Sequence, residues 1–304
     1  MAKGAAVAGE RAIGIDLGGT KIEGVVLEGG RPEPVARLRV ATERERGYDH
    51  ILGRIAEVVA ALRPHAPGAK LVGIGTPGST SARDGTLKNS NTTCLNGRRL
   101  AADLEARLGC PVRLENDANC FALAEALAGA GQGHGLVFGV ILGTGVGGGI
   151  VIDGRLRPGP QHIAGEWGHH AIDPAGPPCY CGQRGCVETL VSGPALEAAY
   201  RAAGGAACGA AEIAARAAAG EAVAGVVLER YLDRFGRALA NVISILDPDV
   251  VVLGGGLSNL DVLYTRGRDA VARYVFNDEL RTPIVPNRLG DSAGVYGAAL
   301  LAAA

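Results

Sequence analysis

The chain of 304 residues is poor in aromatic side chains and carries almost no net charge. Phe, Trp and Tyr make up 4% of it, and 30 Lys and Arg against 31 Asp and Glu leave a formal charge of −1. Nucleic-acid binding needs an excess of cations for the phosphates and often aromatic platforms for the bases. These shortages argue against nucleic acid as the main partner. With 47% hydrophobic residues, the chain can nevertheless bury a large core.

The cysteines and the apolar runs exclude further classes of protein. Seven cysteines are an odd number, and we expect no charged-then-apolar leader, so the sequence favours a reducing cytoplasm over a secreted disulfide framework. One uncharged stretch, residues 135–152, is long enough to imitate a membrane span, but it contains seven glycines. Each glycine costs a helix about 1 kcal/mol relative to alanine, so we interpret this stretch as buried strands and expect no membrane partner.

Glycine is abundant, with 48 residues, and it marks two similar hairpins. Apolar runs at residues 13–15 and 25–27 flank a Gly-Gly turn, and the same pattern recurs 125 residues later. This repeat predicts two structurally similar halves. Strands at 71–74 and 250–253, a strand ending within 112–119, and helices at 50–62, 100–108, 120–128, 194–219 and 223–246 predict a layered α/β fold.

The first hairpin turn carries the parts of a phosphate site. It combines an acid, two peptides without side chains, a hydroxyl and a cation, namely Asp16, Gly18, Gly19, Thr20 and Lys21. Bare N–H groups can approach anionic oxygens closely, and Asp16 can serve Mg²⁺ directly or through water. The alternative is an ordinary turn whose glycines supply only positive φ.

Two further glycine turns strengthen the phosphate interpretation. Gly143, Thr144 and Gly145 repeat the first turn, and a pair of such turns facing each other across a cleft could grip a polyphosphate. Gly254, Gly255 and Gly256 follow a buried strand and predict a bare surface for a purine or ribose. A strand, not a helix, follows Gly148, which argues against a dinucleotide motif, and the absence of Gly-Lys-Ser/Thr excludes a P-loop.

Asp117 is the candidate catalytic base. It opens an apolar helix, where an Asp or Asn is often only an N-cap. If its carboxylate faces a cleft, it could accept the proton of a substrate hydroxyl as phosphoryl transfer proceeds.

Three cysteines and a histidine have the composition of a closed zinc site. His169, Cys179, Cys181 and Cys186 would fill a tetrahedral shell, so the ion would be structural and not catalytic. Redox or coincidental thiols are the alternative, and His170 could replace His169. Glu166 and Glu188 flank this loop and suit the vicinal hydroxyls of a polyol, although solvated surface acids are also common. The remaining cysteines, Cys94, Cys110, Cys120 and Cys208, fit buried small hydrophobic residues.

Taken in order, six segments of the chain resemble the ROK family of sugar kinases, repressors and related proteins. They are residues 16–21, 115–119, 143–145, 165–169, 179–188 and 254–256, and the resemblance runs from residue 13 to a final helix beginning near Gly290. It implies a two-domain actin/hexokinase-like fold, a duplicated ribonuclease H-like ATPase fold with an active-site cleft between the domains. The smaller domain would contain residues 1–117 and 290–304, and the larger one residues 118–289 with the zinc loop.

The same resemblance implies roles for individual residues. Asp117 would be the catalytic base, and sugar hydroxyls would contact Asn116, Glu166, His169 and Glu188, with further contacts expected at Gly78 and Asn91. ATP with Mg²⁺ and a homodimer are also implied, beside the structural Zn²⁺ expected from the cysteine loop. His169 would bind zinc on one side and face the sugar on the other.

The family contains regulators as well as enzymes. Repressors carry a helix-turn-helix domain ahead of the kinase-like part, and only twelve residues precede Ile13, so we expect a hexose kinase and not a sugar-sensing regulator. Residues 88–97, 178–181 and 246–259 are similar to fructokinases that also take mannose, which we expect as the sugars. Residues 115–126 and 141–150 look equally like N-acetylglucosamine kinases, and glucokinase is a third option. We expect transfer to a hydroxyl, O6 in particular.

Overall fold

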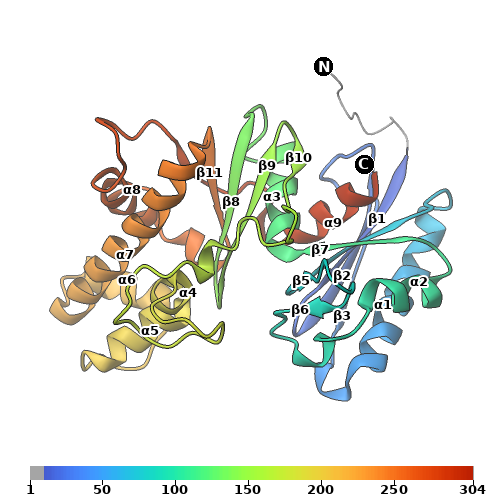
Figure 1. Cartoon of the computed structure of the whole chain (residues 1–304), viewed down its shortest axis with the longest axis horizontal. Helices are drawn as coiled ribbons and strands as arrows, with labels where there is room; N and C mark the ends of the chain where they lie inside the picture. The colour runs from blue at the N-terminus through green and yellow to red at the C-terminus, as the bar shows by residue number, and fades with distance from the viewer. Residues whose placement is uncertain (1–9, 304) are drawn as a thin grey trace. The chain divides into compact units, whose positions relative to one another are not determined.

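The computed structural model describes residues 10–303, which backbone contacts divide into two compact units (Figure 1). Unit 1 contains the described residues up to Gln132, residues 154–164 and the segment from Leu289; unit 2 contains residues 133–153 and 165–288. The expected domain boundary at residue 117 stays a prediction. The contacts group the helix that follows it with unit 1.

Unit 1 is an α/β layer built on a five-stranded sheet. Its strands are β1 (Arg11–Leu17), β2 (Lys21–Glu28), β3 (Ala36–Ala41), β4 (Val72–Thr76) and β7 (Val112–Asn116), with two-residue strands β5 (Ser79–Thr80), β6 (Leu87–Lys88) and β10 (Arg155–Leu156) outside it. Its helices are α1 (Tyr48–Leu62), α2 (Leu100–Leu108), α3 (Asp117–Ala128) and α9 (Ala293–Ala303), with 3-10 turns η1 (Arg44–Arg46), η2 (Arg63–His65), η3 (Thr93–Leu95) and η7 (Gly290–Ser292).

Unit 2 has a matching sheet and more helices. Its strands are β8 (Leu136–Leu142), β9 (Val146–Ile152), β11 (Val250–Gly254) and β12 (Ile284–Pro286). Its helices are α4 (Val187–Val191), α5 (Gly193–Ala202), α6 (Ala210–Ala218), α7 (Ala222–Leu246) and α8 (Arg266–Ala272), with 3-10 turns η4 (Trp167–His169), η5 (Gly256–Asn259) and η6 (Asp261–Leu263).

The strand order confirms the predicted duplication. In unit 1 the sheet runs β3-β2-β1-β4-β7, and in unit 2 the order β9-β8-β11-β12 repeats β2-β1-β4-β7. Each unit starts with an antiparallel hairpin, β1–β2 or β8–β9, and its first strand then pairs in parallel with β4 or β11. The stretch 135–152 therefore forms two strands of a sheet, as predicted. Among the described residues no helix is both long and apolar enough to cross a membrane.

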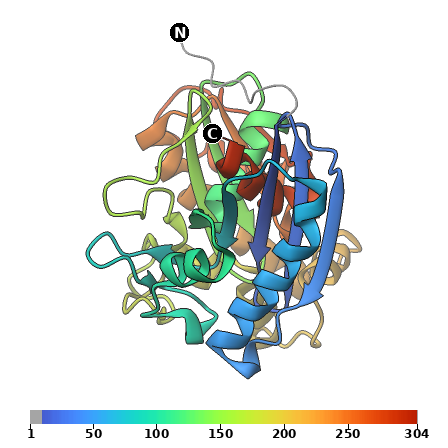
Figure 2. The same ribbon diagram turned by 90° about the vertical axis from the view of Figure 1, so that its right-hand side faces the viewer.

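Two helical layers cover the sheet of unit 1. Val58 and Leu62 of α1 pack where a Cβ on Gly24 would lie, whereas the backbone of α9 packs against Gly14 and Gly73 of β1 and β4. Figure 2 shows α1 in front of the sheet and α9 behind it. Side chains on these two strand positions would separate α9 from the sheet, so glycine lets the two backbones touch.

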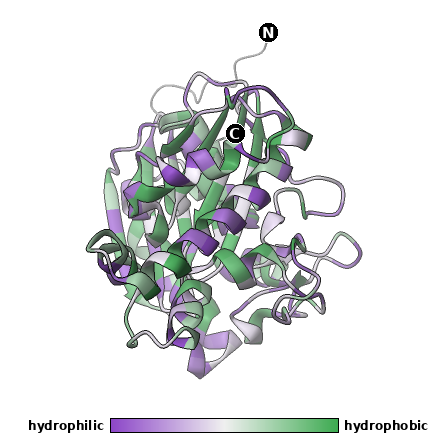
Figure 3. Ribbon diagram, turned by 90° about the vertical axis from the view of Figure 1, so that its left-hand side faces the viewer, coloured by the Kyte–Doolittle hydropathy of each residue, from purple (hydrophilic) through white to green (hydrophobic). Residues whose placement is uncertain are grey.

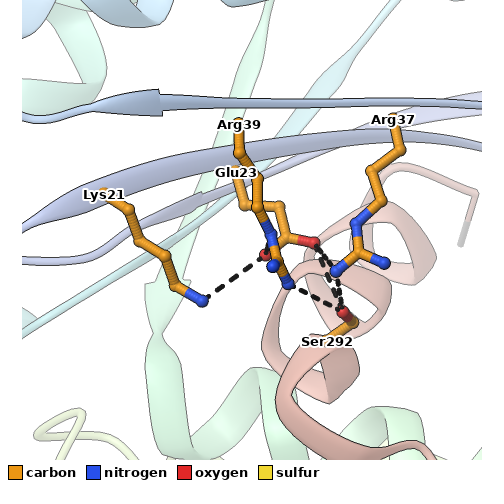
Figure 4. Close-up of polar contacts among 5 residues, drawn as sticks. All are labelled: Lys21, Glu23, Arg37, Arg39 and Ser292. Carbon is orange, nitrogen blue, oxygen red and sulfur yellow. Dashed lines mark hydrogen bonds and ion pairs between the residues drawn. The ribbon is translucent and has the colours of Figure 1, made fainter.

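A buried carboxylate fastens the start of α9 to β2 and β3 (Figure 4). Glu23 is 1% exposed, and its carboxylate pairs with Arg37 at 2.6 Å and with Arg39 at 2.7 Å. The hydroxyl of Ser292 donates to the same carboxylate at 3.3 Å, and Lys21 lies 3.8 Å away. A charge this deeply buried is stable only when it is paired and hydrogen-bonded, so this cluster fixes where α9 begins.

Two helices of unit 2 were predicted, of which one differs in the structure, and α4 and α8 were not predicted. Residues 223–246 form the predicted long helix, α7, whose buried positions recur every three or four residues, and Figure 3 shows hydrophobic and hydrophilic segments alternating along such helices. The predicted helix 194–219 is two helices, α5 and α6. The chain turns at Gly204, where φ is +93°, and the ring of Tyr200 fills the space that a side chain on Gly205 would need.

We predict that Gly73→Ala destabilises unit 1 by more than about 2 kcal/mol, since the new Cβ would overlap the backbone of Ala298 and overpacking of a tight contact commonly costs about 1–3 kcal/mol. Gly53→Ala, within α1, is the matched control, because only the end of Arg107 lies near its new methyl group, at 3.8 Å. It should leave stability unchanged or raise it by up to about 1 kcal/mol. Urea unfolding of both variants checks this, and a Gly73→Ala protein as stable as the wild type would contradict the packing argument.

Candidate active site

The glycines of the two hairpin turns serve close approach and not unusual backbone angles. Neither Gly18 and Gly19 of unit 1 nor Gly143 and Gly145 of unit 2 has a positive φ. A Cβ on Gly18 would lie 2.9 Å from the carbonyl oxygen of Lys21, and one on Gly145 would lie 2.6 Å from the carboxylate of Glu188. The alternative of ordinary turns with glycine for φ therefore does not apply, and both turns present bare backbone.

The first turn is held by the segment that follows β3. The hydroxyl of Thr42 donates to the carbonyl oxygen of Gly18 at 2.7 Å, and the amide of Thr42 donates to the carbonyl oxygen of Thr20 at 3.0 Å. The amide of Gly18 closes the turn on Lys21 at 2.9 Å. Lys21 itself is directed to Glu23, and Thr20 is exposed. The turn is thus a fixed scaffold with an exposed tip.

Asp16 and Asp117 form an acidic pair in unit 1. Loss of hydration around its carboxyl raises the pKa of Asp16 to about 7, and the nearby charges of Asp117 and Glu23 contribute to this rise. Loss of hydration also raises the pKa of Asp117, although the Ala118 amide, which donates to its carboxylate at 2.8 Å, opposes this. Two carboxyl groups that repel one another in this way form a natural cation site or acid–base pair.

Glycines leave room beside the Asp16 carboxyl. A Cβ on Gly75 or on Gly294 would lie 3.6 Å from it. Larger side chains there would fill the space next to the carboxyl oxygens. Oxygen ligands with open space beside them suit a hydrated Mg²⁺ ion, so the residues fit the predicted metal role of Asp16.

Asn116 is the N-cap of α3, and Asp117 is its first residue. The Asn116 side-chain oxygen accepts from the amides of Ala118 at 2.9 Å and Asn119 at 3.4 Å, and its amide group donates to the carbonyl of Gly78 at 3.0 Å. Capping thus belongs to Asn116 and leaves Asp117 for another role. Gly78, with φ +87°, packs against the backbone of Ser90, so the structure brings Asn116, Gly78 and the loop before Asn91 together in unit 1.

The cysteine loop of unit 2 gathers the predicted ligands. His169, Cys179, Cys181 and Cys186 offer ligand atoms that all lie within 4.8 Å of one another. Nδ1 of His169 lies 3.6 Å from the Cys179 sulfur, and the sulfurs of Cys181 and Cys186 are also 3.6 Å apart. Ligands on a tetrahedral zinc ion, about 2.0–2.3 Å from the metal, have this mutual spacing. His170 lies outside the group and contacts Asn241 at 3.2 Å.

The predicted sugar-binding acids lie beside this loop. Glu188 follows Cys186 at the start of α4, and its carboxylate accepts from the amide of Val146 at 3.0 Å. Glu166 precedes η4, whose Trp167 donates to the carbonyl of Gly147 at 2.9 Å. Both contacts tie the loop to β9. The loop and the second glycine turn therefore form one continuous part of unit 2.

Tyr180 is a site residue that the sequence analysis missed. Its hydroxyl lies 2.9 Å from Nε2 of His169, and the two rings meet edge to face with centroids 5.0 Å apart. The side chain is 71% exposed, which is unusual for a large aromatic residue. In the sequence, its position between Cys179 and Cys181 was the signal that could have indicated Tyr180 as a site residue.

The third glycine segment is also exposed. It follows the buried strand β11, and Gly255 and Gly256 are exposed whereas Gly254 is buried. A Cβ on Gly255 would collide with the backbone of Leu142, and its φ of +80° favours glycine as well. This segment lies next to the end of β8, and so beside the second turn in unit 2.

Comparison with known proteins identifies the family of this chain. The model of the ROK family matches residues 12–304. The chain belongs to the ROK family. It is 42% identical over 299 residues to an N-acetyl-D-glucosamine kinase of Photobacterium profundum, with 95% of this chain and 98% of the relative covered.

Solved structures agree with the family and show the fold. The chain superimposes on a ROK hexokinase of Thermus thermophilus with a TM-score of 0.85 and 34% identity, over 95% of this chain and 97% of that one. It also matches a ROK glucokinase of Streptomyces griseus, solved with glucose and AMPPNP, with a TM-score of 0.79 and 31% identity over 96% and 98% of the two chains. The fold is the predicted actin/hexokinase-like one, and sugar phosphorylation is the activity that these comparisons support.

We predict that Asp16 makes stability fall as pH rises. The pKa of Asp16 is higher in the folded state than in the unfolded chain. Between about pH 4 and pH 7 the folded state therefore keeps this proton while the unfolded chain releases it. Over this range the free energy of unfolding should fall by at most about 4 kcal/mol. Asp16→Asn should flatten this decline, whereas Asp278→Asn, a change at an exposed aspartate, should leave the decline as it is in the wild type. Urea unfolding without Mg²⁺ or nucleotide from pH 4 to 8 checks this; equal slopes for wild type and Asp16→Asn would contradict it.

Proposed function

We propose that the protein is an ATP-dependent kinase that phosphorylates N-acetyl-D-glucosamine on O6. The observation that carries this proposal is the carboxyl of Asp117, placed at the start of α3 with capping left to Asn116 and with its pKa raised by lost hydration. A carboxylate of raised pKa is a better proton acceptor than an ordinary aspartate. Family membership and the 42% identity to an N-acetylglucosamine kinase support the reaction.

In the proposed reaction, Asp117 accepts the proton of the sugar O6 hydroxyl as that oxygen attacks the γ-phosphorus of ATP. The new O6–P bond forms while the bond from the γ-phosphorus to its bridging oxygen breaks, and ADP leaves with that electron pair. Phosphoryl transfer depends strongly on alignment and charge, so Asp117 need only orient the O6 hydroxyl and accept its proton late in the reaction. Domain closure, as the resemblance implies, would exclude water as a competing acceptor.

The nucleotide site is proposed on the glycine segments. Bare peptides at Gly18, Gly19, Gly143 and Gly145 would donate to the phosphates, with help from Thr20, Lys21 and Thr144, and Gly254–Gly256 would lie against the nucleoside. Asp16 would hold Mg²⁺, which neutralises charge on the phosphates when bound. The match to a glucokinase solved with AMPPNP supports a nucleotide donor.

The sugar is proposed from the relatives, and it differs from the first expectation. Residues 88–97 and 178–181 favoured fructose and mannose, and the comparisons do not support these sugars. They support the alternative, N-acetylglucosamine, which a relative with 42% identity is named for. Asn91, Asn116, Glu166, His169 and Glu188, together with Gly78, are the proposed sugar contacts. Nε2 of His169 is the atom that would serve this role, because Nδ1 lies 3.6 Å from the Cys179 sulfur; the sugar would then take the place of the Tyr180 hydroxyl, which lies 2.9 Å from Nε2.

A structural zinc ion is proposed in the cysteine loop of unit 2. His169, Cys179, Cys181 and Cys186 would bind it, and the ion would hold Glu166 and Glu188 in place. A hydrogen bond from the Gln183 amide lowers the pKa of the Cys181 thiol, which favours the thiolate that zinc requires. The expected homodimer and cytoplasmic location stay predictions.

A sugar panel tests the proposed reaction. ADP release should show a kcat/KM for N-acetylglucosamine at least about tenfold above those for glucose, mannose, fructose and N-acetylmannosamine, a difference of about 1.4 kcal/mol in transition-state binding. Asp117→Asn should lower kcat by at least about 100-fold while sugar binding persists. Preference for another sugar would overturn the assignment, and near-normal turnover by the variant would remove Asp117 from the role of base.

Elemental analysis tests the zinc proposal. The wild-type chain should hold one zinc ion, and Cys181→Ser should lose it, with sugar affinity reduced through displacement of Glu166 and Glu188. Cys208→Ser, outside the cluster, is the matched control and should keep both zinc and affinity. A metal-free wild-type preparation with full activity would contradict the proposal.

A further inference from the structure

A pocket in unit 1 lies beside the first glycine turn, and Asn91 is the one residue of its lining with a role in the proposed reaction. Its volume is about 370 Å³, and the residues that line it are Arg44, Glu45, Asn91, Thr92, Thr93 and Cys94. A Cβ on Gly19 would lie 3.3 Å from Nη1 of Arg44 and 3.7 Å from Oγ1 of Thr92. The pocket thus lies between the proposed phosphate turn and the proposed sugar contact at Asn91.

Arg44 is a cation without a partner in this pocket. Within residues 10–303 no hydrogen bond or ion pair holds its guanidinium group, although other arginines on this side of unit 1 are paired. The neighbouring acid, Glu43, is directed elsewhere, to His50 at 2.7 Å and Arg46 at 3.3 Å. Glu45 also lines the pocket, and both Arg44 and Glu45 are exposed, so solvent screens their charges.

Thr92 supplies a second unused donor. Its residue is 2% exposed, and its Oγ1 has no hydrogen-bond partner in the part of the chain that the structure describes. A buried hydroxyl without a partner costs about 1–3 kcal/mol, so such a group is rare and points to a missing ligand. Its position is fixed, because its amide donates to the hydroxyl of Ser90 at 3.1 Å and Asn96 closes the same loop on Ser90.

Left-handed residues precede both walls of the pocket. Glu43, directly before Arg44, has φ +49°, a position that most non-glycine residues avoid, and Asn89, three residues before Thr92, has φ +59°, which asparagine adopts more readily. The hydrogen bonds from Thr42 to Gly18 and Thr20 anchor the Arg44 wall to the turn. Strained residues held by their surroundings are typical of ligand sites.

We propose that Arg44 and Thr92 form a subsite for the phosphoryl group during its transfer from ATP to the sugar. Resting on the proposed function, this assigns two residues that contact the transferred group itself. Negative charge is spread over three equatorial oxygens in this transition state, and a guanidinium fork and a hydroxyl can donate to them. Neither residue gains or loses a proton. The subsite explains why the buried hydroxyl of Thr92, beside a glycine turn, has no hydrogen-bond partner within residues 10–303.

Kinetics of Arg44 variants test the subsite. Arg44→Gln should lower kcat by at least about 100-fold with little change in the KM for sugar, since the interaction is made mainly in the transition state. Arg44→Lys keeps the positive charge but lacks the planar guanidinium fork, so its kcat should lie between those of the wild type and Arg44→Gln. Arg83→Gln, a paired arginine whose side chain is 89% exposed on unit 1, is the control for lost charge and should keep wild-type kcat.

Thr92→Val separates the ligand role from a structural one. Removing a buried hydroxyl that has no partner should leave the Tm unchanged or raise it, whereas it should lower kcat by about tenfold or more. Calorimetric titration with the sugar and with its 6-phosphate gives a readout besides activity. Both Arg44→Gln and Thr92→Val should weaken binding of the 6-phosphate and leave binding of the sugar unchanged.

The outcomes separate this inference from the proposed function. If the wild type phosphorylates no sugar, the proposed function fails before the variants are compared. If the wild type is active and Arg44→Gln and Thr92→Val keep its kcat and its affinity for the 6-phosphate, the subsite is wrong while the kinase remains. A Thr92→Val protein that loses stability instead would show that the hydroxyl serves the fold.

Discussion

The loss of hydration around two carboxyl groups in unit 1, those of Asp16 and Asp117, is the constraint on which the proposed chemistry depends. It raises the pKa of Asp16, near the end of β1, to about 7, and the charges of Asp117 at the start of α3 and of Glu23 add to this rise. Arg37 and Arg39 neutralise Glu23, whereas within residues 10–303 no ion pair holds Asp16 or Asp117. A fold that keeps two acids in this state pays in stability, and a bound cation and an acidic proton acceptor are the functions that such a pair serves.

The fold produces this arrangement because glycines let backbone segments of unit 1 pack directly against one another. Gly14 and Gly73 let α9 touch the sheet, and Gly75 and Gly294 keep the space beside Asp16 open. Glu23 and Ser292 then fix the start of α9. Each of these glycines lies next to a backbone or an acid, so the high glycine content reflects close packing around the site as well as turns.

Much of the fold and part of the site could be predicted from the sequence. The 125-residue repeat predicted the two hairpins because bare turns between apolar runs leave a clear local pattern. The cysteine spacing predicted, for the same reason, that His169, Cys179, Cys181 and Cys186 lie together. The break between α5 and α6 was missed because alanine-rich composition hides the effect of two glycines. Arg44, Thr92 and Tyr180 were missed because their positions depend on contacts between distant segments and on left-handed residues such as Glu43, which leave no periodic signal.

The sharpest test of the central claim is a structure of the complex with N-acetylglucosamine and a non-hydrolysable ATP analogue. The account predicts phosphate oxygens within hydrogen-bonding distance of amides in both the Gly18-Gly19 and the Gly143-Thr144-Gly145 turns. It also predicts a carboxylate oxygen of Asp117 about 2.6–3.2 Å from the sugar O6, with that oxygen in line with the γ-phosphorus. A triphosphate bound away from either turn, or an Asp117 carboxylate directed away from the sugar, would contradict it.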